Sequence, residues 1–250
     1  MSYLILGASS GLGRELANIL AKNLNNLIII SRDERDLKTI KSDLEVRFKI
    51  VVKYFVLDAS SFDEVKKFLE SNLSLLNETQ GIMFPIGMVE AEDKISNDMS
   101  ISNSLIQANI GTVAYFLSKI FPVFLKKNNG VIVGFGSVSS AVGREVNTVY
   151  AASKRGLDSL FESLALTAST SKIKIQYYTI GYLDSNLAYG RKLLLPKGSV
   201  NKLAKIVYKN LKKNYKKIYY PSWWVIIVIM INILPFVLLK NIYKLLKNKN

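Results

Sequence analysis

Short apolar runs alternate with longer segments of helical spacing along most of the chain. The runs are rich in β-branched residues, and they predict strands at Tyr3–Leu6, Leu27–Ile30, Ile50–Val56, Gly81–Phe84, Val131–Phe135, Ile173–Thr179 and Ile218–Tyr220. Helical spacing between them predicts helices at Arg14–Leu24, Glu34–Val46, Phe62–Leu75, Ser104–Leu125 and Val149–Thr170. Strands that alternate with helices indicate an α/β fold, a single doubly wound parallel sheet with helices on both faces.

Residues 201–250 differ in charge from the rest of the chain. Residues 1–200 hold 23 basic and 19 acidic side chains, a net charge of +4, whereas residues 201–250 hold 11 basic and none acidic, a net charge of +11. Inside this segment Trp223–Leu239 is apolar apart from Asn232, and it contains Pro235. The sequence therefore predicts one α/β domain over 1–200 and a basic, apolar helical tail over 201–250.

A basic tail suits nucleic acid or an anionic membrane surface. The apolar run favours the membrane, because nucleic-acid binding does not require one, and the run begins with an aromatic cluster of Tyr219, Tyr220, Trp223 and Trp224. Lysines on both sides and Pro235 favour a helix lying on the membrane, or a shallow helical hairpin around Pro235, over a crossing. A buried C-terminal helix or a dimer contact is the alternative.

Composition restricts the chemistry. A chain that is 49% hydrophobic and 21% charged can form a folded core. It has no cysteine and no histidine, which excludes disulfides, thiolate nucleophiles, Ser-His-Asp catalysis and metal sites that use those side chains. Proton transfer would have to use Tyr, Lys, Ser or carboxylates. The amino terminus has no basic region followed by an apolar stretch, so we expect no export and a cytoplasmic location at the membrane face.

A glycine-rich turn follows the first predicted strand. It reads Gly7-Ala-Ser-Ser-Gly11-Leu-Gly13 and leads into a helix. Glycines allow a tight turn and close approach to a pyrophosphate, while the helix offers free N–H groups and its positive end. This arrangement predicts dinucleotide binding by a Rossmann-type sheet, with contacts from Gly7, Ser9, Ser10, Gly11, Leu12 and Gly13. An ordinary strand-to-helix turn is the alternative.

The ends of the second and third predicted strands bear on the choice of cofactor. Ser31 and Arg32 stand where an acidic residue would hold the ribose 2′-hydroxyl of NAD, so a 2′-phosphate and NADP, as NADPH, are favoured. Arg14 is a second candidate to bind this 2′-phosphate. Arg32 would alternatively pair with Asp33 or Asp36. Asp58 is placed to accept a hydrogen bond from the adenine amino group of the cofactor. It could equally cap the helix that follows.

Tyr150 and Lys154 are the candidates for proton transfer. They lie four residues apart, on one face of a predicted helix. The spacing alone is weak evidence, because the chain repeats it at Tyr115/Lys119, Tyr208/Lys212 and Tyr243/Lys247. Ser137 adds context, since it follows a predicted central strand at the sheet edge where such folds place their chemistry.

Together these residues resemble the short-chain dehydrogenase/reductase family. The matching residues are the Gly7–Gly13 turn, Arg32, Asp58, Asn109, Ser137 and Tyr150-Ala-Ala-Ser-Lys154. The resemblance implies an NAD(P)-dependent oxidoreductase with Asn109, Ser137, Tyr150 and Lys154 as catalytic residues. It also implies cofactor contacts from Tyr150, Lys154, Ala59, Gly87, Gly181, Leu183 and Ser185, and a homodimer or homotetramer formed through long helices.

In this mechanism Tyr150 protonates the alkoxide that forms when a carbonyl accepts hydride, and Lys154 lowers the pKa of the phenol. Ser137 holds the carbonyl oxygen, and Asn109 holds a water that relays protons to Lys154. Two segments depart from the family pattern, Phe84-Pro85-Ile86-Gly87 and Ile180-Gly181. They leave open a catalytically inactive NADP-binding scaffold or sensor at the membrane.

The substrate expected from the tail is a lipophilic or lipid-linked ketone. The stretch Gly143–Asp158 and the end of the chain from Tyr219 to Pro235 resemble bacterial reductases of polyprenyl-phosphate-linked keto-sugars, in which a keto-pentose on decaprenyl phosphate is reduced. Steroid and retinoid dehydrogenases of the same family carry similar tails. A basic nucleic-acid-binding tail on an unrelated α/β core is the remaining alternative.

Overall fold

The structure, a computed structural model, describes residues 2–90, 93–94, 99–184, 195–214 and 216–247. Seven strands form one parallel sheet in the order β3-β2-β1-β4-β5-β6-β7. Their bounds are β1 Ser2–Leu6, β2 Asn26–Ser31, β3 Val52–Val56, β4 Thr79–Phe84, β5 Val131–Ser137, β6 Lys174–Ile180 and β7 Lys216–Tyr220. The helices are α1 Gly11–Lys22, α2 Glu34–Phe48, α3 Phe62–Ser71, α4 Leu73–Glu78, α5 Met99–Ile106, α6 Thr112–Lys127, α7 Thr148–Thr167, α8 Val200–Asn210, α9 Trp224–Ile233 and α10 Phe236–Lys247, with a π-helical turn η1 Gln107–Gly111 and a 3₁₀ turn η2 Val138–Ala141.

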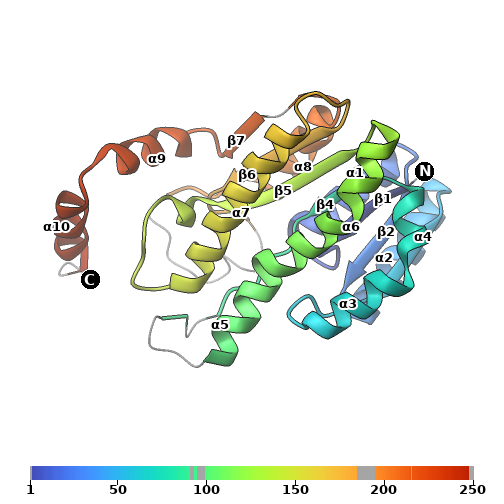
Figure 1. Cartoon of the computed structure of the whole chain (residues 1–250), viewed down its shortest axis with the longest axis horizontal. Coiled ribbons are helices and arrows are strands. Elements are labelled where there is room, and N and C mark those ends of the chain that lie inside the picture. The colour runs from blue at the N-terminus through green and yellow to red at the C-terminus, as the bar shows by residue number, and fades with distance from the viewer. Residues whose placement is uncertain (1, 91–92, 95–98, 185–194, 215, 248–250) are drawn as a thin grey trace.

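Helices cover both faces of the sheet (Figure 1). Successive side chains of a strand point to opposite faces, so β1 divides its residues between two cores. Leu4 and Leu6 pack with α3, α4, α6 and α7 on one face, whereas Ile5 packs with α1, α2 and α8 on the other. The predicted doubly wound sheet is confirmed.

The strand order reverses between β1 and β4, which lie side by side at the centre of the sheet. Ligands of open α/β sheets bind at such a switch point, outside the carboxyl ends of the strands. The glycine turn after β1, the segment after β4 and Ser137 at the end of β5 all lie at this edge. The topology therefore brings the predicted chemistry together.

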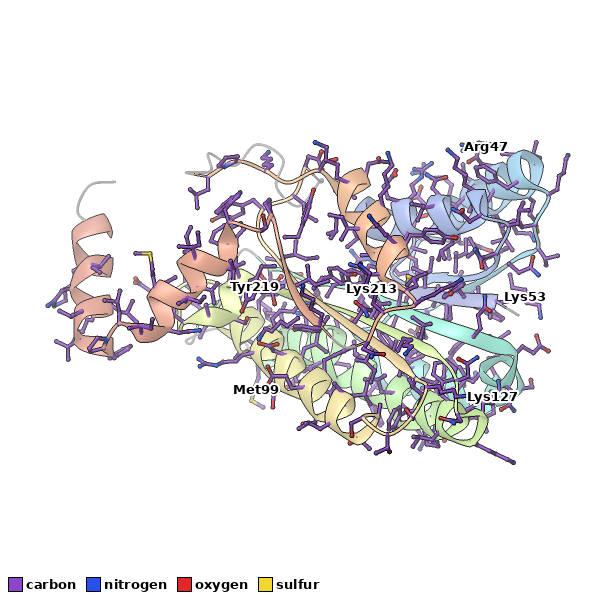
Figure 2. All side chains as sticks on the ribbon, turned by 90° about the horizontal axis from the view of Figure 1, so that it is seen from above. Arg47, Lys53, Met99, Lys127, Lys213 and Tyr219 are labelled. Atoms are coloured by element: carbon purple, nitrogen blue, oxygen red, sulfur yellow. The ribbon has the colours of Figure 1, made fainter. Side chains whose placement is uncertain are left out.

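The predicted helices are present with changed boundaries. The predicted helix over Phe62–Leu75 is two helices, because α3 ends before Asn72 and α4 begins after it. The predicted helix over Ser104–Leu125 is part of a longer run, α5–η1–α6, whose ends Met99 and Lys127 are labelled in Figure 2. This run is long and apolar enough to cross a membrane, but the side chains of α6 pack in the core under the sheet.

The α/β unit extends past the predicted boundary at residue 200. Helix α8 buries Leu203 and Val207 in the same core as α1 and α2, and β7 pairs with β6 as the edge strand. The sequence predicted the strand at Ile218–Tyr220 but not helix α8, and the charge of residues 201–250 led both to be assigned to the tail. The part that extends beyond the sheet therefore begins after Tyr220.

Helices α9 and α10 project from the body of the sheet, and α10 stands clear of it in both views (Figures 1 and 2). The two helices are bent by 120° at the break that contains Pro235, which agrees with the predicted bend. One side of α9 is buried through Trp224 and Val228. The other side and α10 expose a stripe of large apolar residues, Ile226, Ile229, Met230, Ile233, Phe236, Val237, Leu238 and Ile242.

Candidate active site

A cavity of about 750 Å³ lies at the carboxyl ends of the central strands. It begins at the glycine turn and Arg32, passes Ser137, Tyr150 and Lys154, and ends against α9 at Trp224 and Ile231. One continuous cavity therefore joins the predicted cofactor residues to the predicted catalytic residues. Those that line it are Gly7, Ser9, Ser10, Gly11, Leu12, Ser31, Arg32, Asp58, Ala59, Gly87, Ser137, Tyr150, Lys154, Gly181 and Leu183.

The glycine turn has the geometry that phosphate binding requires. Gly7 and Gly11 have φ values of +98° and +51°, in the left-handed region that favours glycine. A Cβ on Gly13 would come within 1.9 Å of the Gly7 carbonyl oxygen, so the turn tolerates no side chain there. Ser10 makes no side-chain cap on α1. The first N–H groups of α1 thus remain available, and the turn fits a dinucleotide pyrophosphate.

Arg32 is not engaged by the acidic residues that follow it. Asp33 instead caps α2 by accepting a 2.9 Å hydrogen bond from the Asp36 backbone N–H. None of the ion pairs between described residues involves Arg32. Ser31 donates to the Ser9 hydroxyl at 2.8 Å, which ties the end of β2 to the glycine turn. Arg14 is not among the cavity-lining residues.

Asp58 lines the cavity but does not cap α3. Its carboxylate accepts hydrogen bonds from the backbone N–H and the hydroxyl of Ser60, at 2.9 and 2.7 Å. The cap of α3 is Ser61, whose hydroxyl accepts from the Glu64 backbone N–H. The capping alternative for Asp58 is therefore wrong, because the helix begins too far along the chain.

Ser137 and Tyr150 meet at the centre of the cavity. Ser137 is the last residue of β5, and Tyr150 lies in the first turn of α7. Their hydroxyl groups are hydrogen-bonded to each other. Ser139 also donates to the Ser137 oxygen, at 2.9 Å from its hydroxyl. The structure thus brings the serine and the phenol of the predicted catalytic set into direct contact.

Lys154 lies one turn after Tyr150 and is 3% exposed. Its ammonium donates to the backbone carbonyls of Ile86 at 3.1 Å and Phe135 at 3.2 Å, and lies 5.9 Å from the centroid of the Tyr150 ring. Burial lowers the pKa of Lys154 to about 8. The divergent Phe84–Gly87 segment therefore still supplies a partner to this lysine, because the contact uses backbone rather than side-chain atoms.

The surroundings of Tyr150 act on the pKa of its phenol in opposite directions. Burial raises the pKa of the phenol, while the hydrogen bond with Ser137 and the charge of Arg144 lower it. Arg144, a residue to which sequence analysis gave no role, is thus a cation that acts on the phenol in addition to the nearby Lys154.

Asn109 lies beside the cavity rather than in its wall. It is fully buried in the π-helical turn η1, a local widening that is often found at functional sites. Its side chain accepts from the Met88 N–H and donates to the Met88 carbonyl, both at 2.9 Å. A Cβ on Gly87 would lie 3.7 Å from the Lys154 ammonium and 3.8 Å from the Asn109 oxygen, so these groups meet at Gly87.

Two predicted cofactor residues do not line the described cavity. Gly13 packs against Gly7 behind the turn, and Ser185 lies outside the described residues. Gly181 lines the cavity after β6, in contact with Trp224. Leu183, which also lines it, pairs with Gly198.

Sequence analysis missed Asp93. Its side chain is 1% exposed, and its two carboxylate oxygens accept the backbone N–H groups of Val149 and Tyr150, each at 2.9 Å. Asn147, which precedes α7, makes no side-chain cap and donates its own N–H to the Asp93 carbonyl. Asp93 therefore caps the helix that carries Tyr150 and Lys154, although it lies more than 50 residues before that helix in the chain. No short-range pattern links residues so far apart in the chain.

Comparison with known proteins agrees with this geometry. The family model for short chain dehydrogenase matches residues 2–192. The chain belongs to the short-chain dehydrogenase family. It is accordingly an oxidoreductase that acts on hydroxyl and carbonyl groups, in a family that binds NAD(P).

Individual members resemble this short-chain dehydrogenase at modest identity. An uncharacterized oxidoreductase of Staphylococcus saprophyticus is 24% identical over 184 residues, which cover 74% of this chain and 79% of the relative. The 11-beta-hydroxysteroid dehydrogenase-like 3 protein of Arabidopsis thaliana is 26% identical over 242 residues, 93% of this chain and 77% of the relative. A short-chain dehydrogenase from Sphingobium yanoikuyae in complex with NADPH has the same fold, with a TM-score of 0.76, 20% identity, and coverage of 87% of each chain.

Proposed function

We propose that this short-chain dehydrogenase is an NADPH-dependent carbonyl reductase that docks on the cytoplasmic face of a membrane and reduces a lipophilic or lipid-linked ketone. The observation that carries the proposal is the single cavity from the glycine turn, past the bonded Ser137 and Tyr150, to the apolar helix α9. The most specific form of the proposal is a keto-sugar linked to polyprenyl phosphate. It follows from the resemblance of the Gly143–Asp158 stretch and the tail.

The proposed chemistry assigns one task to each side chain. NADPH, when bound, supplies the hydride. Ser137 hydrogen-bonds the carbonyl oxygen and fixes its position. Tyr150 transfers its phenolic proton to that oxygen as the alkoxide forms. Lys154 holds the ribose of the cofactor and stabilises the resulting phenolate. Asn109 keeps the segment after β4 in place through Met88.

The residues that line the cavity near the end of β2 support a preference for NADPH over NADH. Arg32 lines this end without an ion pair to a described acidic residue, and Ser9 and Ser31 add hydroxyl groups beside it. A guanidinium suits the 2′-phosphate of NADPH, whereas an acidic residue would suit NADH.

A lipophilic substrate is supported by the position of α9. Trp224 and Ile231 on its inner side line the cavity, whereas Ile226, Ile229 and Met230 on its outer side are exposed. Lys240 and Lys244 on α10 are exposed as well. An exposed apolar stripe beside lysines suits the surface of an anionic membrane. We infer that a substrate held in the bilayer reaches the cavity along α9.

The test of catalysis is the Tyr150→Phe variant. It should abolish NADPH oxidation with ketone substrates while NADPH still binds, because the phenyl ring keeps the packing and loses only the proton. A panel of lipid-extract fractions and bulky ketones, followed by the loss of reduced-nicotinamide absorbance, would identify the substrate. Unchanged turnover in Tyr150→Phe would exclude this residue as the acid. NADPH binding without oxidation of any fraction by the wild-type protein would favour an inactive scaffold or sensor.

The test of membrane docking uses the outer side of α9. The double variant Ile229→Glu, Met230→Glu should stop co-sedimentation with phosphatidylglycerol vesicles and leave the reduction of a soluble ketone unchanged. Val46→Glu is the matched control, since Val46 on α2 is also exposed and apolar but lies outside the stripe. Equal sedimentation of the double variant and the wild type would refute membrane docking. Salt-sensitive DNA binding that is lost on truncation after Tyr220 would favour the nucleic-acid alternative.

We also expect a homodimer or homotetramer formed through α6 and α7, by analogy with family members. Sedimentation equilibrium in the presence of NADPH measures this directly. A monomer at micromolar concentration would refute it.

A further inference from the structure

Arg144 is a cationic residue in the wall of the active-site cavity. It lies in the loop between η2 and α7, and its exposed side chain lines the cavity beside Tyr150. None of the ion pairs between described residues involves its guanidinium. Glu90 lines the same cavity, yet no ion pair joins it to Arg144. The charge of Arg144 lowers the pKa of the Tyr150 phenol, so the guanidinium acts on the reacting end of the cavity.

The cavity that Arg144 lines has both apolar and polar walls. Val142, Tyr182, Leu183, Trp224 and Ile231 contribute apolar surface, and Ser139 and Asn147 contribute polar groups. Lys154 is the other nearby cation, but it is buried and donates to two backbone carbonyls. Of these two cations, Arg144 is therefore the one that can form a bidentate hydrogen bond with a ligand that enters the cavity. Its planar fork matches the oxygens of a carboxylate or a phosphate.

We propose that Arg144 binds an anionic group, a phosphate or a carboxylate, that the ketone substrate carries a short distance from its carbonyl. The substrate class is then an anionic amphiphile, whose apolar part lies along α9 and whose charge meets Arg144. This inference rests on the proposed carbonyl reductase function and narrows it, because a neutral lipophilic ketone would make no use of the charge of Arg144.

The first test is binding, which does not depend on turnover. Hexyl phosphate, hexanoate and hexanol are titrated into the NADPH complex by calorimetry, with wild-type protein and with Arg144→Gln. Wild-type protein should bind at least one of the two anions more tightly than hexanol, and Arg144→Gln should weaken that binding by about 10- to 100-fold, the loss expected for a charge-assisted hydrogen-bonded pair. Which anion is preferred distinguishes a phosphate from a carboxylate.

The matched control is Arg155→Gln. Arg155 is an exposed arginine on α7 that lines a separate small cavity under α9 rather than the active-site cavity. It should leave the binding of all three probes within about 2-fold of wild type, because a long-range change in net charge alone is largely screened by salt. Equal binding of the anions by wild-type protein and Arg144→Gln, or no preference of the wild-type protein for an anion over hexanol, would overturn the proposal.

The second test is turnover of paired substrates. A 3-oxo acid and its methyl ester share one keto chain, but only the acid is charged. A keto-alkyl phosphate and the corresponding alcohol form a second such pair. Arg144→Gln should raise KM for the charged member of the preferred pair by about 10- to 100-fold and leave KM for its neutral partner within about 2-fold. An equal rise for both members would show a merely structural role and refute the proposal. Failure of the wild-type protein to oxidise NADPH with any ketone would refute the proposed function, while the binding test still decides the role of Arg144.

Discussion

The indole of Trp224 occupies the space where a side chain on Gly181 would stand. A Cβ on Gly181 would lie 1.8 Å from the indole nitrogen Nε1. Gly181 follows β6 at the edge of the cavity, and Trp224 is the first residue of α9. The helix that carries the exposed apolar stripe is therefore packed directly on the backbone of the active site.

Gly181→Ala should disturb this contact. The added methyl group has to displace Trp224, at a cost of about 1–3 kcal/mol for overpacking, and α9 moves with it. We expect a lower melting temperature and a lower kcat/KM for bulky ketones. Thermal unfolding and steady-state kinetics measure the two effects. Gly143→Ala is the control, because a Cβ there meets nothing within 4 Å. An equal loss in both variants would contradict the packing argument.

Asp93→Ala should impair catalysis by releasing the start of α7. It removes both acceptors of the Val149 and Tyr150 N–H groups, which costs about 1 kcal/mol of stability for a helix cap, and more where the site is buried. We expect kcat to fall while KM for NADPH changes little, because Tyr150 loses its fixed position and the glycine turn does not.

Asp93→Asn serves as the conservative variant in that comparison. It keeps one acceptor oxygen, so kcat should recover in part relative to Asp93→Ala. If both variants lost stability and retained the wild-type kcat, Asp93 would be a structural cap without influence on Tyr150.

Arg32→Ala should weaken NADPH binding by about 10- to 100-fold, the range for a charge-assisted hydrogen bond, and leave NADH binding nearly unchanged. The reason is that NADPH alone carries the 2′-phosphate. Fluorescence titration with both nucleotides gives the two dissociation constants. Arg35→Ala, at a nearby exposed arginine on α2 that does not line the cavity, should leave both constants unchanged. Equal weakening of both nucleotides by Arg32→Ala would exclude NADPH selection by this residue.

Lys154 should make the stability of the protein rise with pH above about 8. Its pKa is about 8 in the folded protein against an ordinary 10.5, so between these values the unfolded chain binds more protons and unfolding becomes less favourable as pH rises. The full effect is on the order of 3 kcal/mol. Urea unfolding of wild-type protein and Lys154→Met at pH 7.5 and 10 isolates this residue. A difference in stability between the two proteins that stays constant with pH would contradict the lowered pKa.

The sequence by itself determined the strands, most helices and the central chemistry, because those depend on local patterns. Period-two and helical spacing follow from the burial of strands and helices. The position of Ser137 at the end of β5 and the spacing of Tyr150 and Lys154 sufficed to predict one site, and the structure brings the three together. Even the bend at Pro235 is a local property, since proline cannot continue a helix.

Only the tertiary structure decided which groups from distant parts of the chain meet. Asp93 caps α7, Trp224 packs on Gly181, and the charge of Arg144 acts on the phenol of Tyr150. Charge likewise concealed that α8 and the predicted strand β7 belong to the α/β unit, because their burial depends on α1, α2 and β6 as partners. Such contacts arise when separate elements are packed together, and no short stretch of sequence contains the geometry that sets them.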